Sequence, residues 1–160
     1  MELLALPFVQ AENGQMTFVS ITRLRVRSIR FMPWFAVDTV RTSRQVKTAE
    51  GFLGGSLLAD RKRTFWTMTL WREQPDMRRY MTGGAHLKAM PKLLHWCDEA
   101  SVVHWEQPDA TAPDWLEADR RMRTEGRPSK LHHPGPNHRD LTYDAPRISG
   151  AVPIKSARSR

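Results

Sequence analysis

The sequence has a single cysteine, Cys97, and no apolar run near the roughly 20 residues that a membrane-spanning helix needs. One cysteine excludes an internal disulfide and a cysteine-rich zinc site, as expected in a reducing compartment. Glycine-rich phosphate loops, the Gly-x-Ser-x-Gly elbow and the His-Glu-x-x-His motif are also absent. An acid, Glu2, stands where a secretory signal peptide carries positive charge. We therefore expect a cytoplasmic protein with no membrane span, no nucleotide cofactor and no metal site.

The composition is that of a globular protein, with 40% hydrophobic and 26% charged residues in 160. This length suits one domain better than two. A formal net charge of +8 is typical of proteins that bind nucleic acid or an anionic surface. The basic residues, however, are spread along the chain, and no nucleic-acid-binding motif surrounds them. We interpret the charge as solvated surface and do not expect nucleic-acid binding.

Hydrophobic periodicity divides the central part of the chain into strands and helices. Alternation of apolar and polar residues predicts strands, whereas apolar residues three or four apart predict helices. The turn over residues 60–63 is too short for a parallel crossover, so its two flanking strands form a hairpin. The expected strands cover residues 17–27, 51–60, 64–71 and 101–106. The first expected helix covers residues 32–47, and the second is a helical region in two pieces, residues 74–81 and 85–96.

This βαββαβ order predicts an α+β fold of the ferredoxin-like type, with a four-stranded antiparallel sheet and the helices on one face. We assign residues 16–107 to this domain and residues 1–15 to an N-terminal segment. In residues 108–160 we expect a short helix over 113–124 and then a basic, irregular tail. The last 35 residues contain five prolines and few large apolar groups, which is typical of chain that is extended or disordered alone or that lies over a neighbouring surface.

The strand over residues 64–71 places large apolar side chains on both faces of the sheet. Trp66, Met68 and Leu70 alternate with Phe65 and Trp71. The helices cover one face only, and a bare apolar face of this size is rare on a soluble monomer. We therefore expect a homodimer packed sheet to sheet, with a pocket for a small molecule between each sheet and its helices.

One segment carries a family resemblance. The strand that ends in Thr69-Leu-Trp71 is followed by a helix containing Tyr80 and by the step Gly84-Ala-His86. In these elements the segment resembles the antibiotic-biosynthesis-monooxygenase-like proteins of the dimeric α+β barrel superfamily, closest to the uncharacterised subgroup near spheroidene monooxygenase. The resemblance covers residues 17–106. It implies the fold and dimer described above, and oxygenation of a small aromatic or polyene molecule.

His86 is the candidate catalytic residue. It follows a glycine pair near a helix N-terminus, where the helix dipole disfavours a charged imidazolium. Some members of the resembling family oxidise electron-rich aromatics without a cofactor, and the protein then supplies a base and a dry pocket. A neutral His86 would be that base. The alternative interpretation is that His86 caps the loop or fills the core.

Haem is the alternative cofactor that the resemblance implies. In the haem-degrading branch the iron-binding histidine falls one turn later on the second helix, and Met90 stands at that position here. We therefore favour a protein without a cofactor and place Met90 in the pocket lining. Haem binding through His86 stays open as the alternative.

The remaining candidates are substrate-binding residues. We expect an aromatic wall formed by Trp34, Trp66 and Trp71. Tyr80 completes the framework of the pocket, and the Thr69 hydroxyl can bind a substrate oxygen. Core packing is the alternative explanation of the tryptophans. His104 on the last strand is interpreted as structural. The predicted function is a monooxygenase-like protein that binds a small hydrophobic molecule. The alternative is a non-catalytic dimer that binds a ligand or a protein partner through the same barrel.

Overall fold

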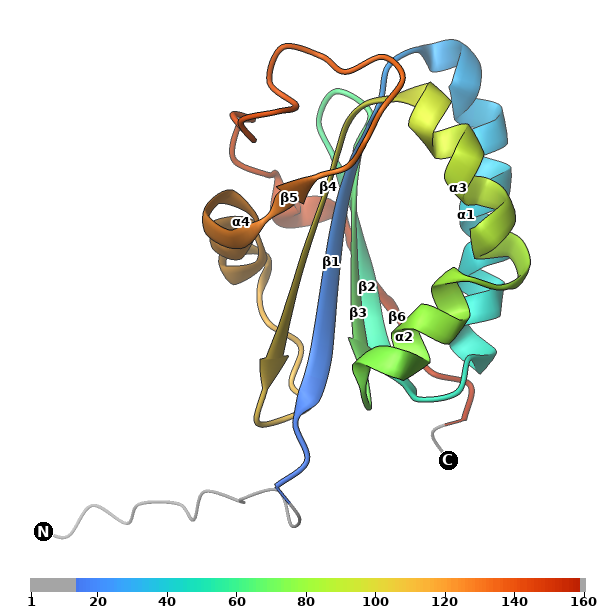
Figure 1. Ribbon diagram of the computed structural model, residues 1–160, viewed down its shortest axis with the longest axis vertical. Coiled ribbons are helices and arrows are strands. Elements are labelled where there is room, and N and C mark those ends of the chain that lie inside the picture. The colour runs from blue at the N-terminus through green and yellow to red at the C-terminus, as the bar shows by residue number, and fades with distance from the viewer. Residues whose placement is uncertain (1–13, 159–160) are drawn as a thin grey trace, which may run out of the picture.

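A computed structural model describes residues 14–158 of the chain, as a sheet with helices on both sides (Figure 1). The strands are β1 (Thr17–Val26), β2 (Phe52–Asp60), β3 (Thr64–Trp71), β4 (Cys97–Gln107), β5 (Arg127–Pro128) and β6 (Ala151–Ile154). The helices are α1 (Met32–Thr48), α2 (Gln74–Met81), α3 (Gly84–Trp96) and α4 (Trp115–Glu125), with short 3-10 turns η1 (Ile29–Phe31) and η2 (Ile148–Gly150). No helix within residues 14–158 is long and apolar enough to cross a bilayer.

The sheet has six strands, in the order β5-β4-β1-β3-β2-β6, and every pair is antiparallel. The prediction of four strands was therefore wrong, although β4-β1-β3-β2 form the centre as expected. The two added strands come from the segment expected to be irregular. Each contains a proline, Pro128 or Pro153. Both strands lie at an edge of the sheet, where a residue without a backbone N–H is tolerated.

The alternation in β3 directs its side chains as predicted. Phe65 packs on Phe35 of α1, with ring centroids 4.8 Å apart, and therefore faces α1, α2 and α3. Trp66 faces the opposite side, where its ring meets Trp115 and Tyr143. Figure 1 shows α1, α2 and α3 on one side of the sheet and α4 with the C-terminal segment on the other.

The second face of the sheet is covered by the same chain. Residues of α4 and of the segment after it pack on the strands, so this segment is ordered and lies over the sheet, although much of it has no regular secondary structure. A partner sheet would have to displace this cover, and the homodimer stays a prediction. The buried residues of this layer are Val19, Ile21, Leu58, Trp66, Met68, Leu70, Val103, Trp105, Ala118, Met122 and Tyr143.

Two side chains fix the C-terminal segment to the sheet. The buried imidazole of His138 accepts at Nδ1 from the Ala100 amide of β4 (3.2 Å) and donates from Nε2 to the Ser129 carbonyl (2.7 Å). The Tyr143 ring lies between the guanidinium groups of Arg23 and Arg123, at 3.9 and 4.1 Å from the ring centroid. Such cation–π contacts and satisfied buried polar groups hold a proline-rich segment that has little regular structure of its own.

Candidate functional site

A cavity of about 600 Å³ lies between the sheet and the helices α1 and α3. Its floor is built by residues of the four central strands whose side chains point toward the helices. Strand pairing sets these residues in rows, because Ser20 lies between His104 and Thr69, and Thr22 lies between Val102 and Thr67. The floor therefore carries a strip of hydroxyl groups flanked by apolar side chains.

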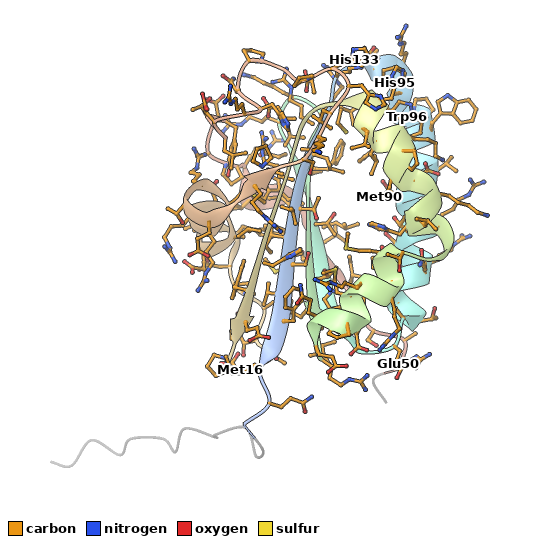
Figure 2. The ribbon with its side chains drawn as sticks, in the orientation of Figure 1. Met16, Glu50, Met90, His95, Trp96 and His133 are labelled. Atoms are coloured by element: carbon orange, nitrogen blue, oxygen red, sulfur yellow. The ribbon has the colours of Figure 1, made fainter. Side chains whose placement is uncertain are left out.

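The roof of the cavity is mostly apolar. Phe35 and Val46 of α1 and Ala89, Leu93 and Leu94 of α3 contribute to it. Figure 2 labels Met90 on the side of α3 that faces the sheet, and Met90 lines the cavity. A roof of this kind favours an apolar ligand.

Asp38 joins the two roof helices. This buried carboxylate on α1 pairs with Lys92 of α3 at 2.5 Å and with Arg41 at 3.8 Å. The pairing bridges the helices on their outer side and neutralises an acid that also contributes to the cavity wall. The roof is thereby tied together without placing an unpaired negative charge next to a bound ligand.

The C-terminal segment forms both side walls of the cavity. Arg127, Ser129 and Leu131 close it along the β4 edge. Gly150, Val152 and Ile154 close it along the β2 edge. The segment passes behind the sheet between these two places, so it belongs to the site as well as to the core.

His86 lies at the start of α3, and neighbouring groups fix its position. Gln45 of α1 donates from Nε2 to the carbonyls of Tyr80 and Gly83 (3.1 and 2.9 Å) and accepts at Oε1 from the His86 amide (2.8 Å). Gly84 has φ +55° and a Cβ there would lie 3.1 Å from Gln45, so this bridge needs glycine. Gln45 carries no signal in the sequence, because a glutamine on a solvated helix face is common.

The His86 ring is prepared to act as a base. Its Nδ1 lies 3.1 Å from the Met81 carbonyl, which can only accept, so Nδ1 carries the proton and Nε2 keeps its lone pair. Burial lowers the pKa of His86 from its ordinary value, while the bond to the Met81 carbonyl raises it by less. The imidazole is therefore neutral at pH 7, and it lines the cavity.

Trp71, Tyr80 and Thr69 lie close to His86 and contact one another. The Tyr80 ring packs on Trp71 at 5.4 Å and on His86 at 4.8 Å. The indole N–H of Trp71 donates to the Thr69 hydroxyl at 2.8 Å, and both groups are buried. Burial raises the pKa of Tyr80, so its hydroxyl stays protonated. Tyr80 and Thr69 line the cavity, whereas Trp71, which was predicted to bind the substrate, does not line it and packs behind Tyr80.

We predict that Thr69→Val destabilises the fold by about 1–3 kcal/mol, because the Trp71 N–H is then buried without an acceptor. Thr67→Val is the matched control. Thr67 also lines the cavity on β3, but no hydrogen bond to its hydroxyl is found in the described part of the chain. Urea denaturation measures both. Equal stability of the two variants would show that the hydroxyl of Thr69 does not support the indole.

Two of the predicted wall residues lie elsewhere. Trp34 is 64% exposed in a shallow hollow on the outer side of α1 and α3, with Phe31 and Trp96. The next residue, Phe35, takes the buried position, and a helix turns successive side chains about 100° apart. Trp66 adds atoms to the cavity wall, but its ring packs on the opposite face of the sheet. The expected wall of three tryptophans is therefore not formed.

His104 and Arg127 are cavity residues that sequence reasoning missed. His104 was interpreted as structural because it alternates with Val103 and Trp105 on the last strand and was expected near the dimer interface. Arg127 was assigned to the irregular tail. A group of three His, Cys, Asp or Glu side chains that could hold a metal ion is not found anywhere in residues 14–158.

The family described as "Domain of unknown function (DUF3291)" matches residues 34–152. The chain belongs to this DUF3291 family. The match includes the helices over the cavity, α4 and most of the C-terminal segment, whereas β1 of the floor and Ile154 of the wall lie outside it. No curated protein matches the sequence.

Solved structures show which fold this DUF3291 protein shares. A "putative antibiotic biosynthesis monooxygenase" from Nitrosomonas europaea superposes with a TM-score of 0.51 at 15% identity, covering 64% of this chain and 99% of that one. Rv0793 from Mycobacterium tuberculosis gives 0.52 at 10% identity, covering 60% and 99%. A protein of unknown function from Nitrosomonas europaea gives 0.51 at 12% identity, covering 64% and 99%. The predicted α+β fold of monooxygenase-like proteins is thereby confirmed. The subgroup near spheroidene monooxygenase stays a prediction.

Proposed function

We propose that this protein binds a small aromatic or polyene molecule in the cavity and oxidises it with O₂, with His86 as the base. The observation that carries the proposal is the neutral His86 imidazole on the wall of an apolar cavity, held with its proton on Nδ1. The cavity has the size and lining of a small-molecule site, with an apolar roof and a few hydroxyls on its floor.

The chemistry needs a substrate that loses a proton to give a stabilised carbanion or phenolate. For a ring methylene beside a carbonyl, His86 Nε2 takes one proton, and the carbanion then passes an electron to O₂. The two radicals combine through a C–O bond, and the proton returns to give a hydroperoxide. Loss of water leaves a carbonyl. The carbon loses four electrons and O₂ gains four, so one oxygen atom enters the product and the other leaves as water.

Haem is the alternative cofactor that the fold family implies. His86 resembles a haem ligand, since its second nitrogen is held by a backbone carbonyl. Haem also carries two propionates, and Arg127 is the sole lysine or arginine among the cavity residues of the described chain. The lining does not fit haem on this count, and we derive no step through it.

Anthrone, whose ring methylene is acidic, is the probe that tests the proposal. With purified protein we expect saturable O₂ consumption at one O₂ per anthrone and anthraquinone as the product. Anthrone binding without O₂ consumption would favour a non-catalytic binding protein instead. A Soret band in the purified protein would favour haem. Absence of both binding and turnover contradicts the proposal.

A further inference from the structure

One buried nitrogen on the cavity floor has no partner. His104 Nε2 is shielded from solvent, yet no hydrogen bond to it is found within residues 14–158. A buried polar atom without a partner is costly, and the great majority of such atoms in native proteins are paired. The Phe18 ring packs at 5.2 Å from the imidazole and offers it no partner. His104 lines the cavity, so a bound ligand can supply the missing partner.

Arg127 stands beside His104. Strand β5 pairs Arg127 with Val102, which lies two residues before His104 on β4 and points to the same face. Diagonal neighbours of this kind on adjacent antiparallel strands are within reach of long side chains. Arg127 is exposed at the edge of the sheet, where it lines the cavity, and none of the ion pairs or hydrogen bonds between described residues uses its guanidinium, so its charge is free to meet a ligand.

The surroundings favour a negatively charged ligand group. Burial lowers the pKa of His104, and the charges of Arg127 and Arg78 lower it further, so the imidazole is neutral. Asp38, the acid among the cavity residues of the described chain, is already paired with Lys92. Ser20 follows His104 in the same row of the floor and adds a hydroxyl donor. Nothing on the floor neutralises Arg127, and three donors can converge there.

We propose that the cavity takes an amphipathic carboxylate, with its head group bound by Arg127 and by the N–H of His104. One oxygen accepts from the exposed guanidinium at the edge of the sheet, and the other accepts from Nε2, which thereby gains the partner it lacks. The inference deepens the proposed function, because it uses the same cavity and names the class of its ligand.

The imidazoles of His86 and His104 lie toward the same end of the sheet. His104 contacts Phe18, whose partner on β3 is Trp71. Trp71 supports Tyr80, which packs on His86. A carboxylate held by His104 therefore brings the head-group end of the ligand, rather than its far end, toward the base.

A matched pair of fluorescent probes tests the inference, namely anthracenecarboxylate and the neutral anthracenemethanol. We expect the wild-type protein to bind the carboxylate at least about tenfold more tightly. Arg127→Gln is expected to remove this preference and to leave the alcohol within about twofold. Arg120→Gln removes the same charge from α4, on the opposite face of the sheet, and is expected to leave both affinities unchanged.

His104→Phe separates ligand binding from stability. The variant keeps a ring against Phe18 and removes the unpartnered nitrogen, so we expect equal or higher thermal stability together with loss of the carboxylate preference. Loss of stability would assign His104 a structural role and overturn the inference. Equal wild-type affinities for both probes, or a preference that survives Arg127→Gln, would overturn it and leave the cavity proposal standing. If neither probe binds, both proposals fail.

Discussion

Ending the chain after Gly126 is expected to abolish cooperative unfolding. The deletion removes β5, β6 and the buried side chains of His138, Tyr143 and Ile154. It uncovers Trp66 and Met68 on the second face of the sheet and opens both side walls of the cavity. The free energy that this buried apolar surface contributes exceeds the net stability of a typical domain, which is about 5–15 kcal/mol.

Single substitutions test the same layer without removing it. Tyr143→Ala is expected to cost about 3 kcal/mol, because it empties the space between Trp66, Arg23 and Arg123. Ile148→Ala in η2, at a side chain that is 47% exposed, is the control and is expected to change stability by less than about 0.5 kcal/mol. Calorimetry measures the stability of the two variants and of the shortened chain, and light scattering measures whether each is a monomer. A shortened chain that melts at an unchanged temperature as a monomer would show that the C-terminal segment is not part of the core.

His86→Gln is expected to reduce O₂ consumption with anthrone by about a hundredfold or more, which is the usual size of a general-base contribution. Glutamine keeps a polar side chain of similar size but cannot take the proton. Binding of anthrone is expected to change little. His95→Gln, an exposed histidine in the outer hollow with Trp34, is the control and is expected to keep the wild-type rate.

The pH profile distinguishes a base from a packing residue. Burial lowers the pKa of His86 below 6.5, and the base acts only when neutral. The rate is therefore expected to be constant near pH 7 and to fall as the pH drops through the lowered pKa. This acid limb should disappear in His86→Gln. An acid limb that persists in the variant, or a wild-type rate in it, would assign proton removal to another group.

The central fold was predictable from the sequence because its signals are local. Alternation in residues 64–71 gave both the strand and the direction of Phe65 and Trp66, and these directions are confirmed. The helix predicted over 113–124 is α4, with Asp114 as its N-cap accepting from the Glu117 amide. Local spacing and capping were sufficient in these elements.

The C-terminal segment was not predictable in the same way. Its strands have two and four residues, too few for a period to be visible, and its anchors His138 and Tyr143 stand among prolines and charges. The segment is ordered by its contacts with strands that lie far from it in the sequence. The same limit applies to the site. His86, Tyr80, Thr69 and Met90 were found from one continuous segment, whereas His104, Arg127 and Gln45 join it only through pairing and packing.

Titration of anthrone into the wild-type protein and into Thr67→Trp is the most direct test of the account. Thr67 lies at the centre of the cavity floor, and an indole there occupies the space assigned to the ligand while keeping a residue that favours strands. We predict one saturable site per wild-type chain and loss of binding in a variant that still unfolds cooperatively. Unchanged binding by Thr67→Trp would place the ligand outside this cavity and contradict the account.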